Sequence, residues 1–288
     1  MAKFLLPIGC FLALSAFVLA SPVSHPGSEI FDGHYQGDIK LTEVQKKYIE
    51  DVANGIAPST GLLDTTRRWR RNLAGDIEIP YLFNATAGFS KLNANLNWNL
   101  RLLSVVIFSS IAANQFNFMR TQFKWIEDKT CIRFVERTTE IDWVDIINGS
   151  GCWSFLGRIG GRQEVSMIRP GCFWGGTFAH EMMHVIGFDH MHNDVNRDEY
   201  VEIMWDNINP RSRFNFNLGD PLRVTNFNTP YDYRSALHYP RWAFADGGLD
   251  AIVPRDSDYL DVIGSSTMSE ISDGDAIRIN RMHECILH

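Results

Sequence analysis

Residues 180–190 read His-Glu-Met-Met-His-Val-Ile-Gly-Phe-Asp-His, and this stretch decides what the rest of the chain must build. On a helix, residues four apart share a face, so His180 and His184 can point at one ion. Gly187 lets the chain leave the helix through a conformation that a Cβ would penalise, and His190 returns as a third ligand. A buried helix with chance histidines is the alternative, but this spacing argues against it.

The same stretch predicts the metal and a catalytic base. Three neutral imidazoles and a water suit Zn²⁺, which keeps an open coordination position in catalytic sites. Glu181 follows the first ligand but lies off the face that the ligands share, where a general base for a zinc-activated water belongs. The sequence therefore predicts one Zn²⁺ per chain and a hydrolytic reaction.

Composition and net charge limit the classes of protein to which the chain can belong. The chain has 288 residues, of which 45% are hydrophobic and 21% charged, and these values are typical of a globular protein. This length allows one sizeable core or two lobes. The formal net charge of −7 gives no electrostatic reason to expect nucleic acid as a partner.

The N-terminus has the pattern of a secretory signal peptide. Lys3 precedes an apolar run over residues 4–20, and small residues stand at the expected positions before a cleavage site after Ala20. A membrane anchor is the alternative, but the run is short and interrupted by Pro7 and Gly9. We therefore expect a secreted, extracellular protein with residues 1–20 removed and no stable membrane insertion.

Cysteine usage agrees with secretion. Cys10 leaves with the signal peptide, and four cysteines remain: Cys131, Cys152, Cys172 and Cys285. An even number in a secreted chain predicts two disulfides, with three possible pairings. Sequons at Asn84 and Asn148 predict a glycoprotein, although such patterns are common.

Residues 21–71 differ from the rest and are predicted to be a pro-segment. Pro, Gly and Ser are scattered through them, with one helix candidate at Thr42–Ala53. They end in the basic cluster Arg67–Arg71. A solvated charged patch is the alternative, but in a secreted zinc hydrolase this position favours proteolytic removal of a pro-segment. We expect cleavage within this cluster, after Arg71.

The rest of the chain is predicted to mix strands and helices. Thr177 is a candidate N-cap for the zinc helix, and Ser272 or Asp273 opens a helix that runs to about His283. The run Leu102–Ala113 is too short to cross a membrane and is interpreted as a buried helix or strand. The other expectations are strands at Glu78–Phe83, Thr130–Glu136, Asp142–Asn148 and Gln163–Ile168, a helix at Asn114–Asp128, and a loop or edge region at Gly149–Gly161.

With these motifs, the chain resembles the astacin family of metzincin zinc metalloendopeptidases over roughly residues 76–288. Beyond the histidines, the resemblance rests on Glu78–Tyr81, Thr130–Phe134, Gly151–Ser154, Tyr200-Val201, Trp205–Ile208 and Tyr231–Tyr239. It implies an α+β fold with two lobes about a central active-site cleft, formed by residues 72–288. It also implies disulfides that pair Cys131 with Cys285 and Cys152 with Cys172.

Two further roles come from the resemblance. Tyr239 is implied to be a fifth zinc ligand at rest that swings away to donate a hydrogen bond to the oxyanion. The segment Tyr35–Asp38 resembles a pro-segment motif in which the aspartate occupies the zinc position that water needs. Asp38 is therefore the expected latch of the zymogen, and Gly37 before it allows close approach of the backbone.

The chain departs from the family pattern at three places. Leu237 stands where the family has the methionine of its turn beneath the zinc, and it fills a similar apolar volume. Met191 replaces a glutamate that receives the mature N-terminus, which puts that tether in doubt. Residues 263–266 lack the family's arginine, which weakens any preference for an acidic residue after the scissile bond.

The predicted function is a secreted zinc metalloendopeptidase that cuts internal peptide bonds in proteins and is made as a zymogen. Its expected partners are protein or peptide substrates and an activating protease, and the chain is expected to be a monomer. The first alternative is a catalytically silent homologue that acts as a secreted binding protein. Intact Glu181 and Tyr239 argue against it. A zinc hydrolase that acts on small molecules is the second alternative.

Overall fold

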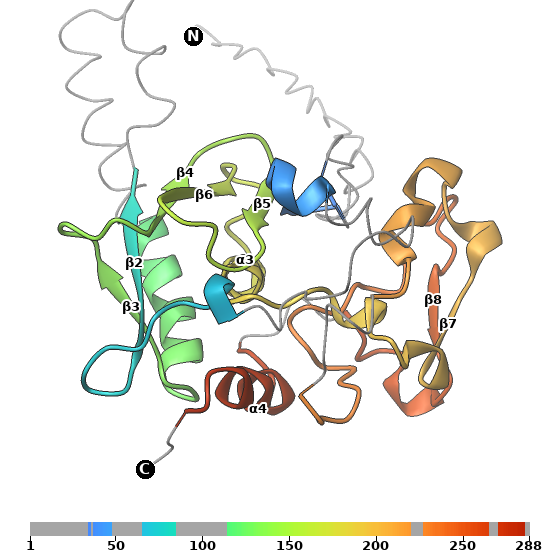
Figure 1. The fold of residues 1–288 in the computed structure, drawn as a ribbon. Helices are drawn as coiled ribbons and strands as arrows, with labels where there is room; N and C mark the ends of the chain where they lie inside the picture. Colours follow the sequence, from blue (N-terminus) through green and yellow to red (C-terminus); the bar gives the residue numbers. More distant parts are fainter. Residues whose placement is uncertain are drawn as a thin grey trace, which may run out of the picture.

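The computed structural model describes residues 34–35, 37–47, 65–84, 114–219, 227–264 and 270–285. These residues form an α+β protein with a six-stranded sheet, a two-stranded sheet and several helices (Figure 1). Within them, no helix is long and apolar enough to cross a membrane. The predicted signal peptide and the run Leu102–Ala113 lie outside the described residues.

The large sheet carries the chain's longest strands. Their order across it is β1 (Ile39–Lys40), β5 (Cys152–Phe155), β6 (Arg162–Met167), β4 (Trp143–Ile147), β2 (Ile77–Phe83) and β3 (Ile132–Glu136). β2 pairs in parallel with β3 and β4, and β4 pairs in parallel with β6, whereas β5 is antiparallel to β6. The four predicted strands are confirmed to within two residues. β5 lies in the Gly-rich segment for which the sequence predicts a loop or an edge.

The first residues of two helices, α3 and α4, can be compared with the capping residues that the sequence predicts. α4 (Asp273–Met282) starts with a capping box in which the Ser272 hydroxyl accepts from the backbone N–H of Asp275 at 2.8 Å, as predicted. α3 (Thr177–Ile186) has Gly176 as its N-cap, so the prediction for Thr177 is wrong by one residue. The Thr177 hydroxyl instead donates to the carbonyl of Trp174 at 2.9 Å.

The remaining helices are short or lie partly outside the description. Residues 114–127 are helical, close to the predicted Asn114–Asp128, and residues 43–47, within the predicted helix Thr42–Ala53, are helical as well. Short 3-10 helices connect the other described elements: η1 (Thr65–Arg67), η2 (Met191–Asn193), η3 (Arg197–Glu199), η4 (Trp205–Asn207), η5 (Pro210–Phe216) and η6 (Ser257–Tyr259).

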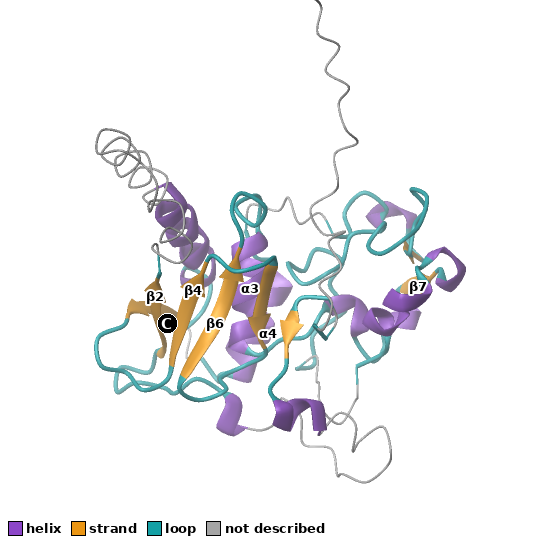
Figure 2. Cartoon of the chain, turned by 90° about the horizontal axis from the view of Figure 1, so that it is seen from above, coloured by secondary structure: helices purple, strands orange, loops and turns teal. Residues whose placement is uncertain are grey.

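Two hydrophobic cores divide the molecule into two lobes. The first joins the sheet, α3 and α4, and its fully buried side chains include Ile79, Phe178 and Ile279. The second lies around β7 (Val201–Ile203) and β8 (Ile252–Pro254), which pair antiparallel. Figure 1 shows β7 and β8 on one side of the molecule and the large sheet on the other, and Figure 2 shows the sheet from above. This is the predicted two-lobed arrangement.

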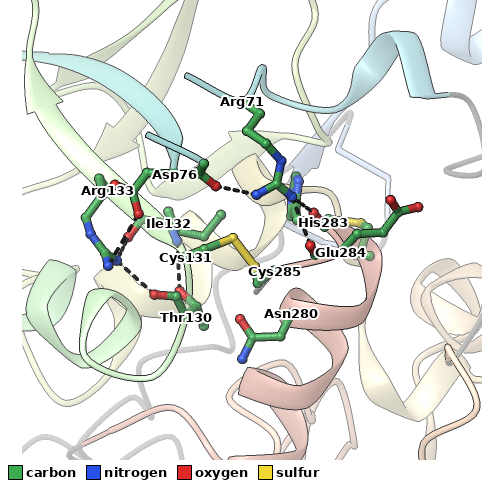
Figure 3. Close-up of a disulfide and its surroundings, with 12 residues drawn as sticks. Arg71, Asp76, Thr130, Cys131, Ile132, Arg133, Asn280, His283, Glu284 and Cys285 are labelled. Atoms are coloured by element: carbon green, nitrogen blue, oxygen red, sulfur yellow. Dashed lines mark hydrogen bonds and ion pairs between the residues drawn. A yellow bond between two sulfur atoms is a disulfide. The ribbon is translucent and has the colours of Figure 1, made fainter. Parts of the chain in front are cut away.

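Two disulfides join the described cysteines, with the pairing that the resemblance implied. Cys131, next to β3, is bonded to Cys285, just past α4, and Cys152 in β5 is bonded to Cys172. The first bond ties the C-terminal helix to the sheet (Figure 3). Because it closes a loop of 154 residues, the chain-entropy model assigns it about 5 kcal/mol.

The basic cluster packs onto the protease domain. Trp69 is 4% exposed, belongs to the first core and donates from its indole N–H to the Val185 carbonyl of α3 at 2.9 Å. Arg68 donates to the carbonyl of Met282 at 2.7 Å, and Arg71 donates to the carbonyls of His283 and Glu284 (Figure 3). Two arginines thus lie at the negative end of the α4 dipole.

A candidate zinc-protease active site

Three histidines converge at the junction of the lobes. α3 presents His180 and His184 one turn apart, Gly187 ends the helix at φ +131°, and His190 follows. The Nε2 atom of His180 lies 3.1 Å from that of His184 and 3.3 Å from that of His190. The sequence therefore predicted this cluster correctly.

The tautomers show that these nitrogen pairs are not hydrogen bonds. Nδ1 of His180 lies 2.8 Å from the carbonyl of Ala236, and Nδ1 of His184 lies 2.7 Å from that of Phe188. A carbonyl can only accept, so each Nδ1 carries the proton and each Nε2 presents a bare lone pair. Carbonyl partners of this kind orient metal-binding imidazoles.

The nitrogen spacing fits Zn²⁺. Zn–N bonds of about 2.0–2.1 Å in a tetrahedron require nitrogen atoms about 3.3–3.4 Å apart. The two Nε2 separations, 3.1 and 3.3 Å, match this value. Lone pairs held this close repel one another unless a cation lies between them, so the donor set is one that could hold the ion.

Asp38 supplies a fourth ligand atom from the N-terminal segment. Its carboxylate oxygens lie 3.1, 3.6 and 3.3 Å from the Nε2 atoms of His180, His184 and His190. The four ligand atoms all lie within 4.8 Å of one another. A carboxylate that faces the bare lone pairs of His180 and His184 at this distance needs a cation between them, so Asp38 completes a donor set that could hold the metal.

Glu181 is buried beside the ligands without binding them. It is 1% exposed, and its Oε2 atom has no hydrogen-bond partner. Burial, followed by the charge of Asp38, raises the pKa of Glu181 to about 8. The Ser154 hydroxyl of β5 donates to the Glu181 carbonyl at 3.1 Å and fixes the backbone here. A buried carboxyl group with one unpartnered oxygen and a raised pKa is typical of a catalytic acid or base.

The turn over residues 231–239 lies against the histidines. Leu237 is fully buried in the first core, and Ala236 supplies the carbonyl that orients His180. Tyr239 is 7% exposed, and its ring contacts the edge of His190 with centroids 4.5 Å apart. The turn thus brings the predicted tyrosine to the metal site.

Buried side chains that the sequence did not single out hold this turn in place. The carboxylate of Asp275, in the first turn of α4, accepts from the backbone N–H of Ala236 at 2.8 Å and from the Ser235 hydroxyl at 2.7 Å. Arg278 donates to the same carboxylate. The contact of Asp275 with a turn 39 residues away leaves no local signal in the sequence.

Comparison with known proteins now decides the family. The family model for astacin, a peptidase family, matches residues 91–284. This chain belongs to the astacin family. Like other astacins it is a zinc-dependent metalloendopeptidase, and protein substrates follow from that membership.

Individual relatives agree with the family assignment. High choriolytic enzyme 1 of Oryzias latipes is 38% identical over 219 residues, which cover 74% of this astacin and 78% of that protein. Zinc metalloproteinase nas-6 of Caenorhabditis elegans is 34% identical over 208 residues, covering 72% and 58%. Meprin A subunit beta of Mus musculus is 33% identical over 242 residues, and this astacin spans 33% of its length.

A solved structure shows the same fold. The hatching enzyme zinc-protease high choriolytic enzyme 1 of Oryzias latipes superposes with a TM-score of 0.63 at 34% sequence identity. The match covers 77% of this astacin and 97% of that chain. The expected metzincin-like fold is therefore confirmed.

In this astacin the unusual Met191 has a buried partner. Its sulfur lies 3.2 Å from a guanidinium nitrogen of Arg278. Three further histidines, His192, His238 and His283, are all buried. Of these, His192 lies nearest to the site.

Proposed function

We propose that this astacin is a secreted endopeptidase made as a zymogen, in which Asp38 closes the zinc site until the pro-segment is cut. The observation that carries the proposal is the carboxylate of Asp38 at the point where three Nε2 lone pairs converge, 3.1–3.6 Å away. A carboxylate oxygen is a good zinc ligand and occupies the position that a catalytic water needs.

In the open site, His180, His184 and His190 would hold the metal, one ion per chain. When bound, Zn²⁺ supplies a Lewis acid that polarises the substrate carbonyl and lowers the pKa of a water toward about 7. Glu181 accepts the proton of that water as it attacks the peptide carbonyl and then delivers the proton to the leaving amine. Its unpartnered oxygen supports this assignment.

Tyr239 is proposed to donate a hydrogen bond to the oxyanion. Its ring lies among His190, His192, Phe216 and Phe244, so the phenol has a defined position beside the ligands. Burial raises the pKa of Tyr239 well above its ordinary value, with further increase from the charges of Asp38 and Glu181. The hydroxyl therefore keeps its proton and can donate it in a hydrogen bond.

The pro-segment also covers the edge of the sheet. β1 pairs in parallel with β5, through Ile39 opposite Ser154 and Lys40 opposite Phe155. An extended substrate is expected to pair with that edge strand by its backbone. Only glycine fits at position 37, where the chain approaches the site before Asp38. Its φ is +88°, and an added Cβ would lie 2.9 Å from the Tyr239 hydroxyl. Latch and covered edge together support zymogen inhibition.

Secretion is proposed from the signal-peptide pattern over residues 1–20 and from the two disulfides. Disulfides persist in oxidising compartments and are rare in the cytosol. The proposal predicts that the exported precursor begins at Ser21, which N-terminal sequencing of the secreted protein checks. A protein retained in the cell with Met1 still in place would contradict secretion.

The first experiment compares casein cleavage by the activated enzyme with that of two variants. Glu181→Ala should keep zinc in elemental analysis yet lose at least a hundredfold in activity, because proton transfer contributes about 10²–10⁴-fold. His184→Ala should lose the metal itself. Glu202→Ala, on the exposed face of β7, is the matched control and should retain activity.

The outcomes separate the rival functions. Near-wild-type activity in Glu181→Ala would contradict the assignment of the base. A wild-type protein that binds zinc but cleaves neither casein nor gelatin would favour a silent binding homologue or an enzyme for small molecules.

A further inference from the structure

His192 lies flat against the proposed oxyanion donor. The imidazole and the phenol ring of Tyr239 have centroids 3.9 Å apart and planes 25° apart, so the rings stack. His192 is fully buried and Tyr239 is 7% exposed. This stack gives Tyr239 a broad ring contact on the side that His190 does not occupy.

The orientation of His192 is fixed by its surroundings. Its Nε2 atom lies 3.1 Å from the carbonyl of Asn215, and since a carbonyl only accepts, Nε2–H is the donor. Asn193 donates to the same carbonyl at 3.0 Å, which ties η2 to η5. Phe216 packs against the imidazole with centroids 5.4 Å apart. His192 is thus part of a rigid support.

Tyr239 lies between two imidazoles of different kinds. Its ring meets the edge of His190 at 60°, and it stacks on His192 at 25°. His190 is a member of the metal-binding group, whereas His192 is not. The phenol ring therefore contacts a candidate metal ligand at its edge and a non-ligand imidazole face to face.

We propose that His192 is a positioning residue that sets where the Tyr239 hydroxyl stands during peptide hydrolysis. The inference rests on the proposed role of Tyr239 and adds the residue that supports it. A flat ring keeps contact with the phenol as it turns, whereas an aliphatic side chain leaves gaps. A gap of about 0.5–1 Å already loses roughly a quarter to a half of the dispersion energy of the atom pairs that face it.

The test compares two replacements that both fill the buried space. His192→Leu keeps apolar bulk without a flat face and should lower kcat about tenfold, or about 1.4 kcal/mol, with little change in KM. His192→Phe restores the flat ring and should return kcat to within about threefold of wild type. Zinc content and the urea midpoint should stay close to wild type in both.

A double-mutant cycle assigns the effect to Tyr239. If His192 acts only through the phenol hydroxyl, His192→Leu should cost nothing further in a Tyr239→Phe background.

The results distinguish a failure of this inference from a failure of the proposed function. Wild-type kcat in His192→Leu, an equal loss in the Tyr239→Phe background, or no restoration by His192→Phe would overturn the positioning role. Wild-type kcat in Tyr239→Phe alone would instead contradict the role of the tyrosine. Should His192→Leu fail to fold, His192→Met takes its place with the same expectations.

Discussion

At the scale of single residues, we expect position 237 beneath the histidines to need only an apolar side chain of suitable volume. Leu237 is fully buried beneath the histidines, and its backbone carbonyl accepts from the N–H of Met191 at 2.9 Å. Leu237→Met swaps two side chains of similar volume, so we expect kcat within about threefold of wild type. Peptide hydrolysis by the activated enzyme checks this.

A gain of tenfold or more in the same assay would contradict the packing account. That gain corresponds to about 1.4 kcal/mol in the barrier, more than a volume-conserving change in a satisfied core should give to catalysis. It would mean that the sulfur itself has a function beneath the metal.

Residue types and spacing were sufficient to predict that three histidines come together. The approach of His180 and His184 follows from helical periodicity, and that of His190 follows from the glycine that ends the helix. Glu181 follows as the residue beside the first histidine, off the face that the ligands share. The supports could not be predicted in this way. Asp275 reaches Ala236 across 39 residues, and the stack of His192 on Tyr239 spans 47, so neither has a local pattern.

At the scale of elements, the basic cluster does more than offer a cleavage site. Trp69 buries its ring in the first core and bonds to α3, so Trp69→Ala should lower the free energy of unfolding by about 3–5 kcal/mol. Urea unfolding of the precursor measures this. Arg70, the next residue, is exposed and supplies the control. Arg70→Ala should change the free energy of unfolding by less than about 0.5 kcal/mol.

These contacts bear on where activation occurs. The predicted boundary at Arg71 stays a prediction, but a cut there would place Trp69 and Arg68 on the departing segment. We therefore expect this cut to lower the free energy of unfolding of the remaining domain, because the indole leaves the first core. N-terminal sequencing of the active enzyme checks the boundary, since a start at Asn72 would support the cut after Arg71 and a start before Thr65 would contradict it.

Element types were predictable where the pattern was strong. The strands around Ile79, Phe134 and Val165 have β-branched and aromatic residues, and Ser272 with Asp275 marks the start of α4. β5 was less clear because glycines surround it, and it becomes a strand by pairing with β6. The contacts of the basic cluster left no signal in the sequence, because Arg68 and Arg71 donate to carbonyls at the end of α4, more than 200 residues away.

At the scale of the whole molecule, buried histidines make stability depend on pH. His283 is 5% exposed, and burial, followed by the charges of Arg68 and Arg71, lowers its pKa to about 4. Between its unfolded value of about 6.5 and about 4, the unfolded chain binds a proton that the folded chain does not. This contribution is fully present above about pH 6.5 and is lost as the pH falls.

The size of this effect can be measured. For His283 the loss between about pH 7.5 and about pH 5 amounts to about 2 kcal/mol. Urea unfolding of the chelator-treated precursor should therefore show a smaller pH dependence in His283→Asn than in wild type, by about that amount. An unchanged pH dependence would mean that His283 titrates normally in the folded protein.

The two lobes, the sheet edge and the metal site meet at the pro-segment. β1 adds to the edge of the sheet, and Asp38, one residue before β1, enters the histidine cluster. The latch therefore uses the binding edge and the metal position of the protease together. Removal of the carboxylate alone should open the metal position while β1 stays in place.

The most direct measurement is the rate of peptide hydrolysis by the uncut Asp38→Ala precursor, with its intact mass verified after the assay. We predict a rate at least tenfold above that of the wild-type precursor, because water regains the fourth metal position. Glu43→Ala, on the exposed side of the pro-segment helix, should stay as inactive as wild type. An Asp38→Ala precursor that stays silent yet becomes active on cleavage by trypsin would contradict the latch.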